Sequence, residues 1–237
     1  MRGPRVAAGG ALVSLAAAAC LPAPATTEAR AIASLYTIFL AAAAVVAAIV
    51  LGLATWSVIR YRAGRTADAD DPPAQTHGNT RLEILWTVVP AVTIAALFGF
   101  TLVTLARVDT VDPVEAGRGA EIEVTAFRWG WTFTYPAEGI TVSGFQEPGP
   151  EVVVPVGEPI TVRLDSADVV HSFYVPRFLF KRDVVPGREN IFQFTVEEAG
   201  SYGGQCAEFC GLYHSRMPFT VRAESRPDYE AWLAAQR

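Results

Sequence analysis

Three uncharged, apolar stretches occupy the first half of the chain, and an alternating pattern follows them. The stretches lie between Arg5 and Glu28, at residues 31–59 and at residues 84–106. From Ala120 onward, apolar and polar residues alternate with a period of two, which is typical of half-buried strands. The pattern therefore predicts apolar helices in the first half of the chain and a β domain in the second.

The second and third stretches predict a hairpin of two membrane helices over residues 31–107. Each stretch is longer than the roughly 20 apolar residues that cross a bilayer as a helix. Neither has a polar face at helical spacing, which a surface helix of a soluble protein would show. We therefore expect membrane helices at about residues 32–60 and 82–107.

The first stretch predicts an export signal at residues 1–20. Arg2 and Arg5 precede an apolar centre, as in secretory signal peptides. The small residues before Cys20 also resemble a bacterial lipoprotein cleavage box, in which the cysteine becomes the acylated N-terminus, although Ala17 stands where leucine is usual. A lipidated Cys20, a plain signal peptide and an uncleaved anchor all remain open.

The positions of arginine predict the orientation of the hairpin. Four arginines lie in or beside the short loop between the helices, whereas the other side of the first helix carries little beyond Arg30. The four are Arg60, Arg62, Arg65 and Arg81. Basic residues favour the cytoplasmic side of short loops. We therefore expect the loop inside the cell, and both the N-terminus and everything after Arg107 outside.

The alternating half predicts an all-β domain at residues 115–224 and a short helix at residues 226–237. Six segments rich in alternating, β-branched or aromatic residues are separated by turns that contain proline and glycine. They are residues 121–127, 131–135, 151–156, 160–164, 190–196 and 219–222. Short strands at this spacing indicate a Greek-key barrel or sandwich.

Composition and charge sharpen the division into two halves. Hydrophobic residues make up 51% of the chain and charged residues 18%, whereas soluble domains carry about 25% charged residues. The net charge of −5 argues against a general nucleic-acid binder, which would show a basic excess. Residues 1–108 hold eight arginines and five carboxylates, whereas residues 109–237 hold eleven basic and nineteen acidic side chains. The two halves therefore face different surroundings.

A cluster of soft metal ligands lies near the end of the β domain. Cys206, Cys210, His214 and Met217 fall within twelve residues, and His171 stands thirty-five residues before the first cysteine. Sulfur ligands with imidazoles select copper, zinc or iron–sulfur clusters. A disulfide between the two cysteines is the alternative in an exported domain. It would give the neighbouring histidine and methionine no role.

The number of thiols bears on which metal is bound. A blue-copper site uses one thiolate, two imidazoles and a weak axial methionine, so Cys206 would be surplus to it. Two thiolates can bridge two copper ions with one histidine on each, which suits electron transfer. A structural zinc site could use both cysteines and both histidines, but it would leave Met217 without a role.

The run from His171 to Met217 resembles subunit II of the bacterial haem-copper cytochrome c oxidases, which carries the dinuclear copper A centre. The resemblance rests on the Cys-x3-Cys-x3-His-x2-Met spacing, the upstream histidine and the run from Gly204 to Gly211. It covers nearly the whole chain, and it implies a cupredoxin-like β domain outside the membrane.

The resemblance implies a role for each ligand. Cys206 and Cys210 would bridge two copper ions, and His171 and His214 would bind one ion each. Met217 and the main-chain carbonyl of Glu208 would complete the two ions. The Glu208 side chain would also reach a magnesium ion at the interface with subunit I.

Two further positions match the family. Trp129 matches the residue at which electrons arrive from cytochrome c, although Gly130 replaces the aromatic residue usual after it; Trp131 and Phe133 we interpret as strand core. Glu83 matches the mouth of the K proton pathway of subunit I, and it also has capping-box spacing from Thr80. His77 we interpret as a loop residue without a metal role.

By resemblance, the chain is the electron-accepting subunit of an aa3-type oxidase, a proton-translocating oxidoreductase of the bacterial cell membrane. Its partners would be subunit I, which holds the haems, other oxidase subunits, membrane lipid, and cytochrome c or a cytochrome c domain. The net charge of −8 in residues 109–237 suits a basic donor. Nucleic acid is not an expected partner.

Four alternatives differ in what they require. A quinol oxidase subunit would lack the copper ligands, and nitrous oxide reductase needs a large catalytic domain that 237 residues do not contain. A membrane nitric oxide reductase of the copper A type could share this plan. A structural zinc or disulfide module that anchors a membrane complex is the remaining alternative.

Overall fold

The computed structural model describes residues 21–62, 77–112 and 119–237. The expected export signal, Cys20 and Arg65 lie outside these residues. The described residues form two compact units: residues 21–34, 104–112 and 119–237 belong to one, and residues 35–62 and 77–103 belong to the other.

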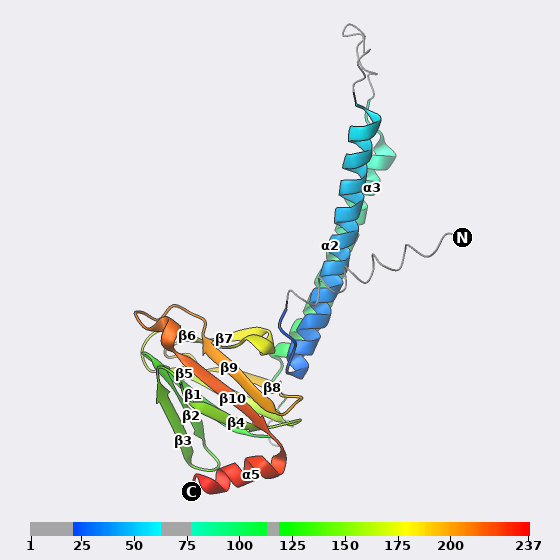
Figure 1. The fold of residues 1–237 in the computed structure, drawn as a ribbon. Coiled ribbons are helices and arrows are strands. Elements are labelled where there is room, and N and C mark those ends of the chain that lie inside the picture. Colours follow the sequence, from blue (N-terminus) through cyan, green and yellow to red (C-terminus); the bar gives the residue numbers. More distant parts are fainter. Residues whose placement is uncertain (1–20, 63–76, 113–118) are drawn as a thin grey trace, which may run out of the picture. The chain divides into compact units, whose positions relative to one another are not determined.

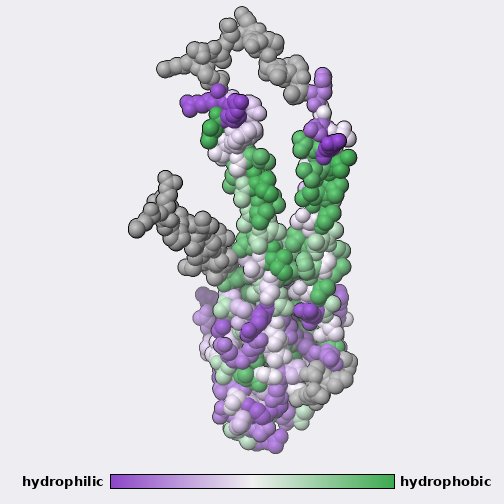
Figure 2. Space-filling view, turned by 90° about the vertical axis from the view of Figure 1, so that its right-hand side faces the viewer, coloured by the Kyte–Doolittle hydropathy of each residue, from purple (hydrophilic) through white to green (hydrophobic). Residues whose placement is uncertain are grey.

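Two long helices, α2 (Thr27–Arg60) and α3 (Thr80–Asp109), contain the two apolar stretches. Both are long and apolar enough to cross a membrane, with mean hydropathies of 2.6 and 2.2 in their most apolar windows. Figure 2 shows their largely apolar surface in green. The expectation of two apolar helices is therefore confirmed.

Both helices begin earlier than the sequence pattern indicates, because polar residues cap their first turns. The Thr26 hydroxyl accepts a hydrogen bond from the backbone N–H of Ala29 at 3.0 Å. The Asn79 side chain accepts one from the N–H of Arg81 at 3.1 Å. Asn79 therefore caps α3, one residue before the threonine of the expected capping box.

The β domain is a sandwich of two five-stranded sheets, drawn from green to red in Figure 1. One sheet has the order β3-β2-β1-β5-β8 and the other β4-β10-β9-β6-β7. The first comprises β1 (Glu121–Phe127), β2 (Gly130–Tyr135), β3 (Ile140–Phe145), β5 (Pro159–Ser166) and β8 (Asn190–Thr195). The second comprises β4 (Glu151–Pro155), β6 (His171–Val175), β7 (Phe180–Val184), β9 (Gly200–Cys206) and β10 (Pro218–Glu224). The helix α5 (Arg226–Ala235) follows β10, so the expected β domain with a C-terminal helix is confirmed.

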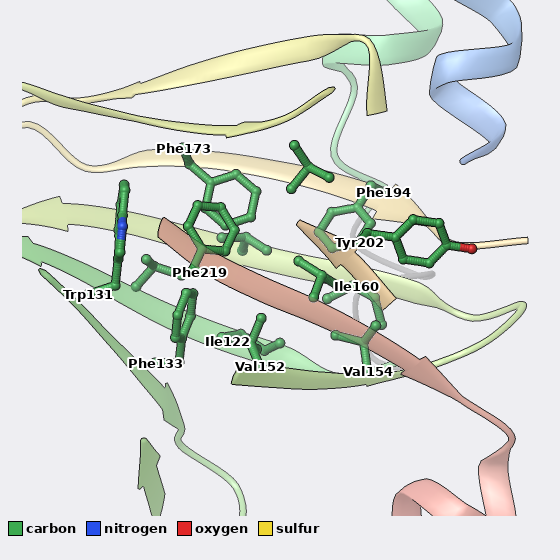
Figure 3. Close-up of a cluster of buried hydrophobic side chains, with 14 of the residues drawn as sticks. Ile122, Trp131, Phe133, Val152, Val154, Ile160, Phe173, Phe194, Tyr202 and Phe219 are labelled. Atoms are coloured by element: carbon green, nitrogen blue, oxygen red, sulfur yellow. The ribbon is translucent and has the colours of Figure 1, made fainter. Parts of the chain in front are cut away.

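Alternate residues of the strands fill the space between the sheets. In β1, Ile122 and Val124 are buried, whereas Glu121 and Glu123 are exposed. Aromatic side chains fill the centre of the sandwich (Figure 3), where the Phe219 ring lies 5.1 Å from that of Trp131. Burial of this apolar surface is the main force that holds the two sheets together.

A segment that includes the first turn of α2, which we call the N-terminal strap (residues 23–30), packs into the β domain. The N–H of Ala25 donates to the carbonyl of Arg177 at 2.9 Å, and the N–H of Glu197 donates to the carbonyl of Ala25 at 3.1 Å. Thr26 pairs with Val196 in an isolated bridge and is fully buried. The strap therefore joins the start of α2 to the β domain.

Candidate metal centre

The two cysteines lie on one loop that leaves the end of β9. This ligand loop (residues 206–217) contains a short 3-10 helix, His214–Arg216, and ends where β10 begins. The Sγ atoms of Cys206 and Cys210 lie 3.9 Å apart, and both thiols are free. A disulfide bond is about 2.05 Å long. The expected alternative of a disulfide between them is therefore absent from this structure.

Each thiol has its own imidazole. His171 reaches the first thiol from β6, with its Nδ1 atom 3.9 Å from Cys206 Sγ. His214 reaches the second thiol from the ligand loop, with its Nδ1 atom 3.6 Å from Cys210 Sγ. The register of the second sheet brings β6 beside the loop, because Phe173 pairs with Cys206 across the two strands.

Each thiol also has one weaker donor atom beside it. The Glu208 carbonyl oxygen lies 3.3 Å from Cys206 Sγ, and Met217 Sδ lies 3.9 Å from Cys210 Sγ. The six residues expected as ligands therefore come together as two matching sets of three. The ligand atoms of His171, Cys206 and Cys210 lie within 4.8 Å of one another, which is close enough to hold a metal ion.

Four of the six expected ligand residues are shielded from water, whereas Glu208 and His214 are partly buried. His171 is fully buried, both cysteines are 4% exposed and Met217 is 1% exposed. Such shielding strengthens electrostatic interactions and limits solvent reorganisation around a charge that changes. The donor set is soft and largely buried, which fits copper.

In the metal-free chain the two thiols differ in acidity. Burial opposes ionisation of Cys206, but hydrogen bonds from His171 and from backbone N–H groups outweigh it and lower the pKa of this thiol. Burial, together with the charge of Cys206, raises the pKa of Cys210. A metal ion that binds both thiols must therefore displace the proton held on Cys210.

Asp168 orients His171 from the side opposite the thiols. Its Oδ1 atom lies 2.9 Å from His171 Nε2, and its Oδ2 atom accepts from the backbone N–H of Arg128 at 2.8 Å. Partial burial would raise the pKa of Asp168, but the hydrogen bonds from His171 and the backbone outweigh it and lower the pKa to about 2. The carboxylate favours the tautomer in which Nε2 carries the proton and Nδ1 is free for a metal.

Trp131 supports the other end of the ligand loop. Its indole Nε1–H donates to the carbonyl of Met217 at 3.2 Å, and the same carbonyl accepts from the N–H of Cys206 at 3.1 Å. Trp131 is fully buried. The strand pattern around Trp131 predicts a core position alone, so its link to an expected ligand was missed.

Trp129 lies beside the ligand loop in the turn between β1 and β2. Its ring meets that of Tyr213 edge-on, with centroids 4.8 Å apart. A Cβ atom placed on Gly211 would lie 3.4 Å from the indole Nε1. Tyr213 was not a candidate in the sequence analysis, because it lies between two expected ligands without being one.

Glu208 and Glu83 occupy different surroundings. The Glu208 carboxylate accepts from Lys181 Nζ at 3.0 Å, and Lys181 also reaches Asp183 at 2.8 Å. Glu83 lies in the first turn of α3, in the other compact unit. His77 precedes α3 and is exposed.

Two apolar helices followed by a cupredoxin-like β-sandwich with a thiol and imidazole cluster define the class of protein. The transmembrane-domain model of cytochrome c oxidase subunit II matches residues 14–102, and the periplasmic-domain model of the same subunit matches residues 146–224. The chain belongs to the cytochrome c oxidase subunit II family. It is therefore a membrane-anchored subunit of an oxidoreductase complex, with a periplasmic domain.

Relatives cover most of the chain. The probable cytochrome c oxidase subunit 2 of Streptomyces coelicolor is 34% identical over 90% of this chain and 77% of its own length. The corresponding protein of Nocardia farcinica is 31% identical over 91% of this chain and 73% of its own length. The periplasmic domain of subunit II of cytochrome oxidase from Bradyrhizobium japonicum is 32% identical, with a TM-score of 0.47 over 49% of this chain and 92% of that one.

Proposed function

We propose that this chain is the electron-accepting subunit of an aa3-type cytochrome c oxidase and holds a dinuclear copper A centre. The observation that carries the proposal is the pairing within the cluster. Cys206 has His171 beside it at 3.9 Å. Cys210 has His214 beside it at 3.6 Å. A mononuclear blue-copper site would use only one of the two thiolates.

The thioether distinguishes copper from zinc. A structural zinc site is tetrahedral and would be completed by the two thiolates and two imidazoles. Met217 is nevertheless buried within the cluster, 3.9 Å from Cys210 Sγ. When bound, a thiolate-bridged copper pair takes up and releases one electron with little rearrangement. The chain's own contribution is to hold the donor atoms in place and exclude water.

Metal titration tests the centre. The purified chain in detergent is titrated separately with copper and with zinc. We expect two copper ions per chain, a purple colour and a seven-line hyperfine EPR pattern, because two copper nuclei share the unpaired electron. A colourless chain that binds one zinc ion and forms no such copper species would contradict the proposal. Cys206→Ser should abolish the dinuclear spectrum, whereas Cys20→Ser should preserve it.

Trp129 is the proposed point at which electrons arrive from cytochrome c or a cytochrome c domain. It is partly buried and contacts the ligand loop through Tyr213. The net charge of −8 in residues 109–237 would attract a basic donor. We expect the rate of electron transfer to fall as ionic strength rises, because salt screens the attraction between the charges. An unchanged rate would contradict electrostatic attraction of the donor.

The remaining partners follow from the proposed complex. Subunit I would hold the haems, reduce oxygen to water and pump protons, with Glu83 near the mouth of its K pathway. Glu208 could supply one carboxylate oxygen to an interfacial magnesium ion, with Lys181 beside it at 3.0 Å. Purification of the complex, with identification of its subunits and its reduced haem spectrum, tests the oxidase type. A complex without a-type haem would contradict it.

The proposed location is the bacterial cell membrane, with both helices spanning the bilayer and the β domain on the outer face. Export would remove residues 1–20 or leave Cys20 as a lipidated N-terminus. Mass spectrometry of the mature N-terminus distinguishes these outcomes. An unmodified first residue other than Cys20 would contradict lipidation.

A further inference from the structure

We propose that Tyr213 is a positioning residue whose ring holds the indole of Trp129 against the ligand loop, so that electron transfer into the cluster depends on this contact. The inference rests on the proposed role of Trp129 as the residue at which electrons arrive. It adds a residue that would control how well Trp129 is placed for that role.

The rings of Trp129 and Tyr213 are in direct edge-to-face contact. Their centroids lie 4.8 Å apart and their planes meet at 85°, which is a favoured edge-to-face arrangement for aromatic pairs. The backbone of Tyr213 is also held within the ligand loop, because its carbonyl accepts a hydrogen bond from the N–H of Arg216 at 2.9 Å. It directly precedes His214, so the ring that contacts the indole is tied to an expected ligand.

The indole of Trp129 pays an energetic penalty in this position. Its Nε1–H is buried and has no hydrogen-bond partner among the residues that the structure describes. A buried donor without a partner costs about 1–3 kcal/mol relative to a solvated one. The indole would therefore turn toward water unless packing opposes that movement. Tyr213 supplies an aromatic contact that opposes it.

Neither of the two glycines near Trp129, Gly130 and Gly211, supplies a side chain that holds the ring. A Cβ atom on Gly130 would lie 2.2 Å from the carbonyl oxygen of Gly144, so this position cannot supply a covering side chain without a shift of the backbone. Gly211 lies against the indole, but it has no side chain and a φ of +119°. Of the residues next to Trp129 on these two segments, Tyr213 supplies the ring contact.

The indole N–H of Trp129 gives a direct measurement of this role. The full chain, metal-free and reduced in detergent, is labelled with ¹⁵N-tryptophan, and each of its five tryptophans gives one indole signal. The Trp129 signal is the one absent from Trp129→Phe. Its exchange with solvent is compared in the original chain, Tyr213→Leu, Tyr213→Met and Tyr213→Phe. Leu212→Ala serves as the neighbouring control, because Leu212 is 79% exposed.

We expect solvent exchange at Trp129 to become about two- to tenfold faster in Tyr213→Leu and Tyr213→Met, the range that loss of an aromatic pair implies. Tyr213→Phe keeps the ring and should exchange at the original rate, as should Leu212→Ala. In the copper-loaded oxidase, Tyr213→Leu should slow electron transfer from the donor by a similar factor while the copper EPR spectrum is kept.

The outcomes separate this inference from the proposed function. If Trp129→Phe leaves electron transfer unchanged, the proposed role of Trp129 is wrong. If Trp129→Phe slows transfer but Tyr213→Leu and Tyr213→Met change neither solvent exchange nor the rate, the positioning role of Tyr213 is overturned. Faster exchange without slower electron transfer would overturn it as well.

Discussion

The Asp168 carboxylate lies 2.9 Å from Nε2 of His171 and also accepts from the backbone N–H of Arg128, the residue before Trp129. One side chain therefore connects the proposed point of electron arrival with an expected copper ligand. Hydrogen bonds of this kind fix the orientation of a ligating histidine, and their removal typically weakens metal binding 10- to 100-fold.

We expect Asp168→Ala to lower copper affinity by about 10- to 100-fold, and Asp168→Asn to lower it less because the amide oxygen still accepts a hydrogen bond. Competition with a copper chelator measures the affinity. Asp165→Asn, an exposed carboxylate on the preceding strand, is the control. Equal affinities of Asp168→Ala and this control would show that the carboxylate does not support the site.

Trp131→Phe tests the hydrogen bond to the Met217 carbonyl. The variant removes the indole donor and part of a fully buried side chain, so we expect a loss of about 2–3 kcal/mol in the free energy of unfolding. Denaturant unfolding of the metal-free chain in detergent measures it. Trp232→Phe, on the partly buried face of α5, should cost less than about 1 kcal/mol. A copper spectrum unchanged in Trp131→Phe would mean that the bond does not position Met217.

Gly130→Ala tests the close approach of β2 to β3. The added methyl group would lie 2.2 Å from the carbonyl oxygen of Gly144 and 2.8 Å from the ring of Phe127. We expect a destabilisation of about 1–3 kcal/mol, because the strand must shift. Gly203→Ala meets nothing within 4 Å and should change stability by less than about 1 kcal/mol. Denaturant unfolding of both variants decides whether the two positions differ.

Thr26→Ala tests the N-terminal strap. The variant loses the hydroxyl that caps the first turn of α2, which typically costs about 1 kcal/mol. Thr27→Ala is the matched control, since its hydroxyl is exposed and donates to the neighbouring Glu28 side chain. We expect tryptic cleavage after Arg30 to accelerate in Thr26→Ala and to stay unchanged in Thr27→Ala. Equal cleavage in the two would show that the cap does not hold the strap.

We expect Tyr229 to contribute to a loss of stability of the β domain at alkaline pH. Burial of its phenol in the packing between α5 and the sandwich raises its pKa from 10 to about 12. The unfolded chain loses this proton first, so the stability is fully present below pH 10 and falls as the pH rises toward 12. A shift of this size corresponds to about 2–3 kcal/mol. Unfolding measured at pH 9 and pH 12 should show a smaller loss in Tyr229→Phe.

Much of the fold could be predicted because the apolar runs and the alternation of period two are local patterns. The strands that the sequence analysis missed have weak local signals. β9 contains three glycines, and it is a strand because it pairs along its length with β10. β6 and β7 are short and pair mainly with each other. Tertiary pairing overrides weak local preference in such segments.

The six expected ligands could be named from the sequence because five of them lie in one short loop. The residues that hold them could not be found in this way. Asp168 lies three residues before His171, which hints at its role, but the hydrogen bond depends on the turn after β5. The contact of Tyr213 with Trp129 depends on how the ligand loop folds back over the β1–β2 turn. Neither of these two contacts can be predicted from the spacing of residues along the chain.

In the proposed membrane topology, the N-terminal strap links folding of the β domain to insertion of the hairpin. Glu28, in the first turn of α2, accepts from the backbone N–H of Thr195, which lies 167 positions later in the chain and after the end of α3. In that topology, the contact can form only if the hairpin has returned the chain to the side of the membrane on which it began. A chain with one helix left uninserted would strand the two partners on opposite faces of the bilayer. Formation of the strap contact would thus distinguish a correctly inserted hairpin from a misinserted one.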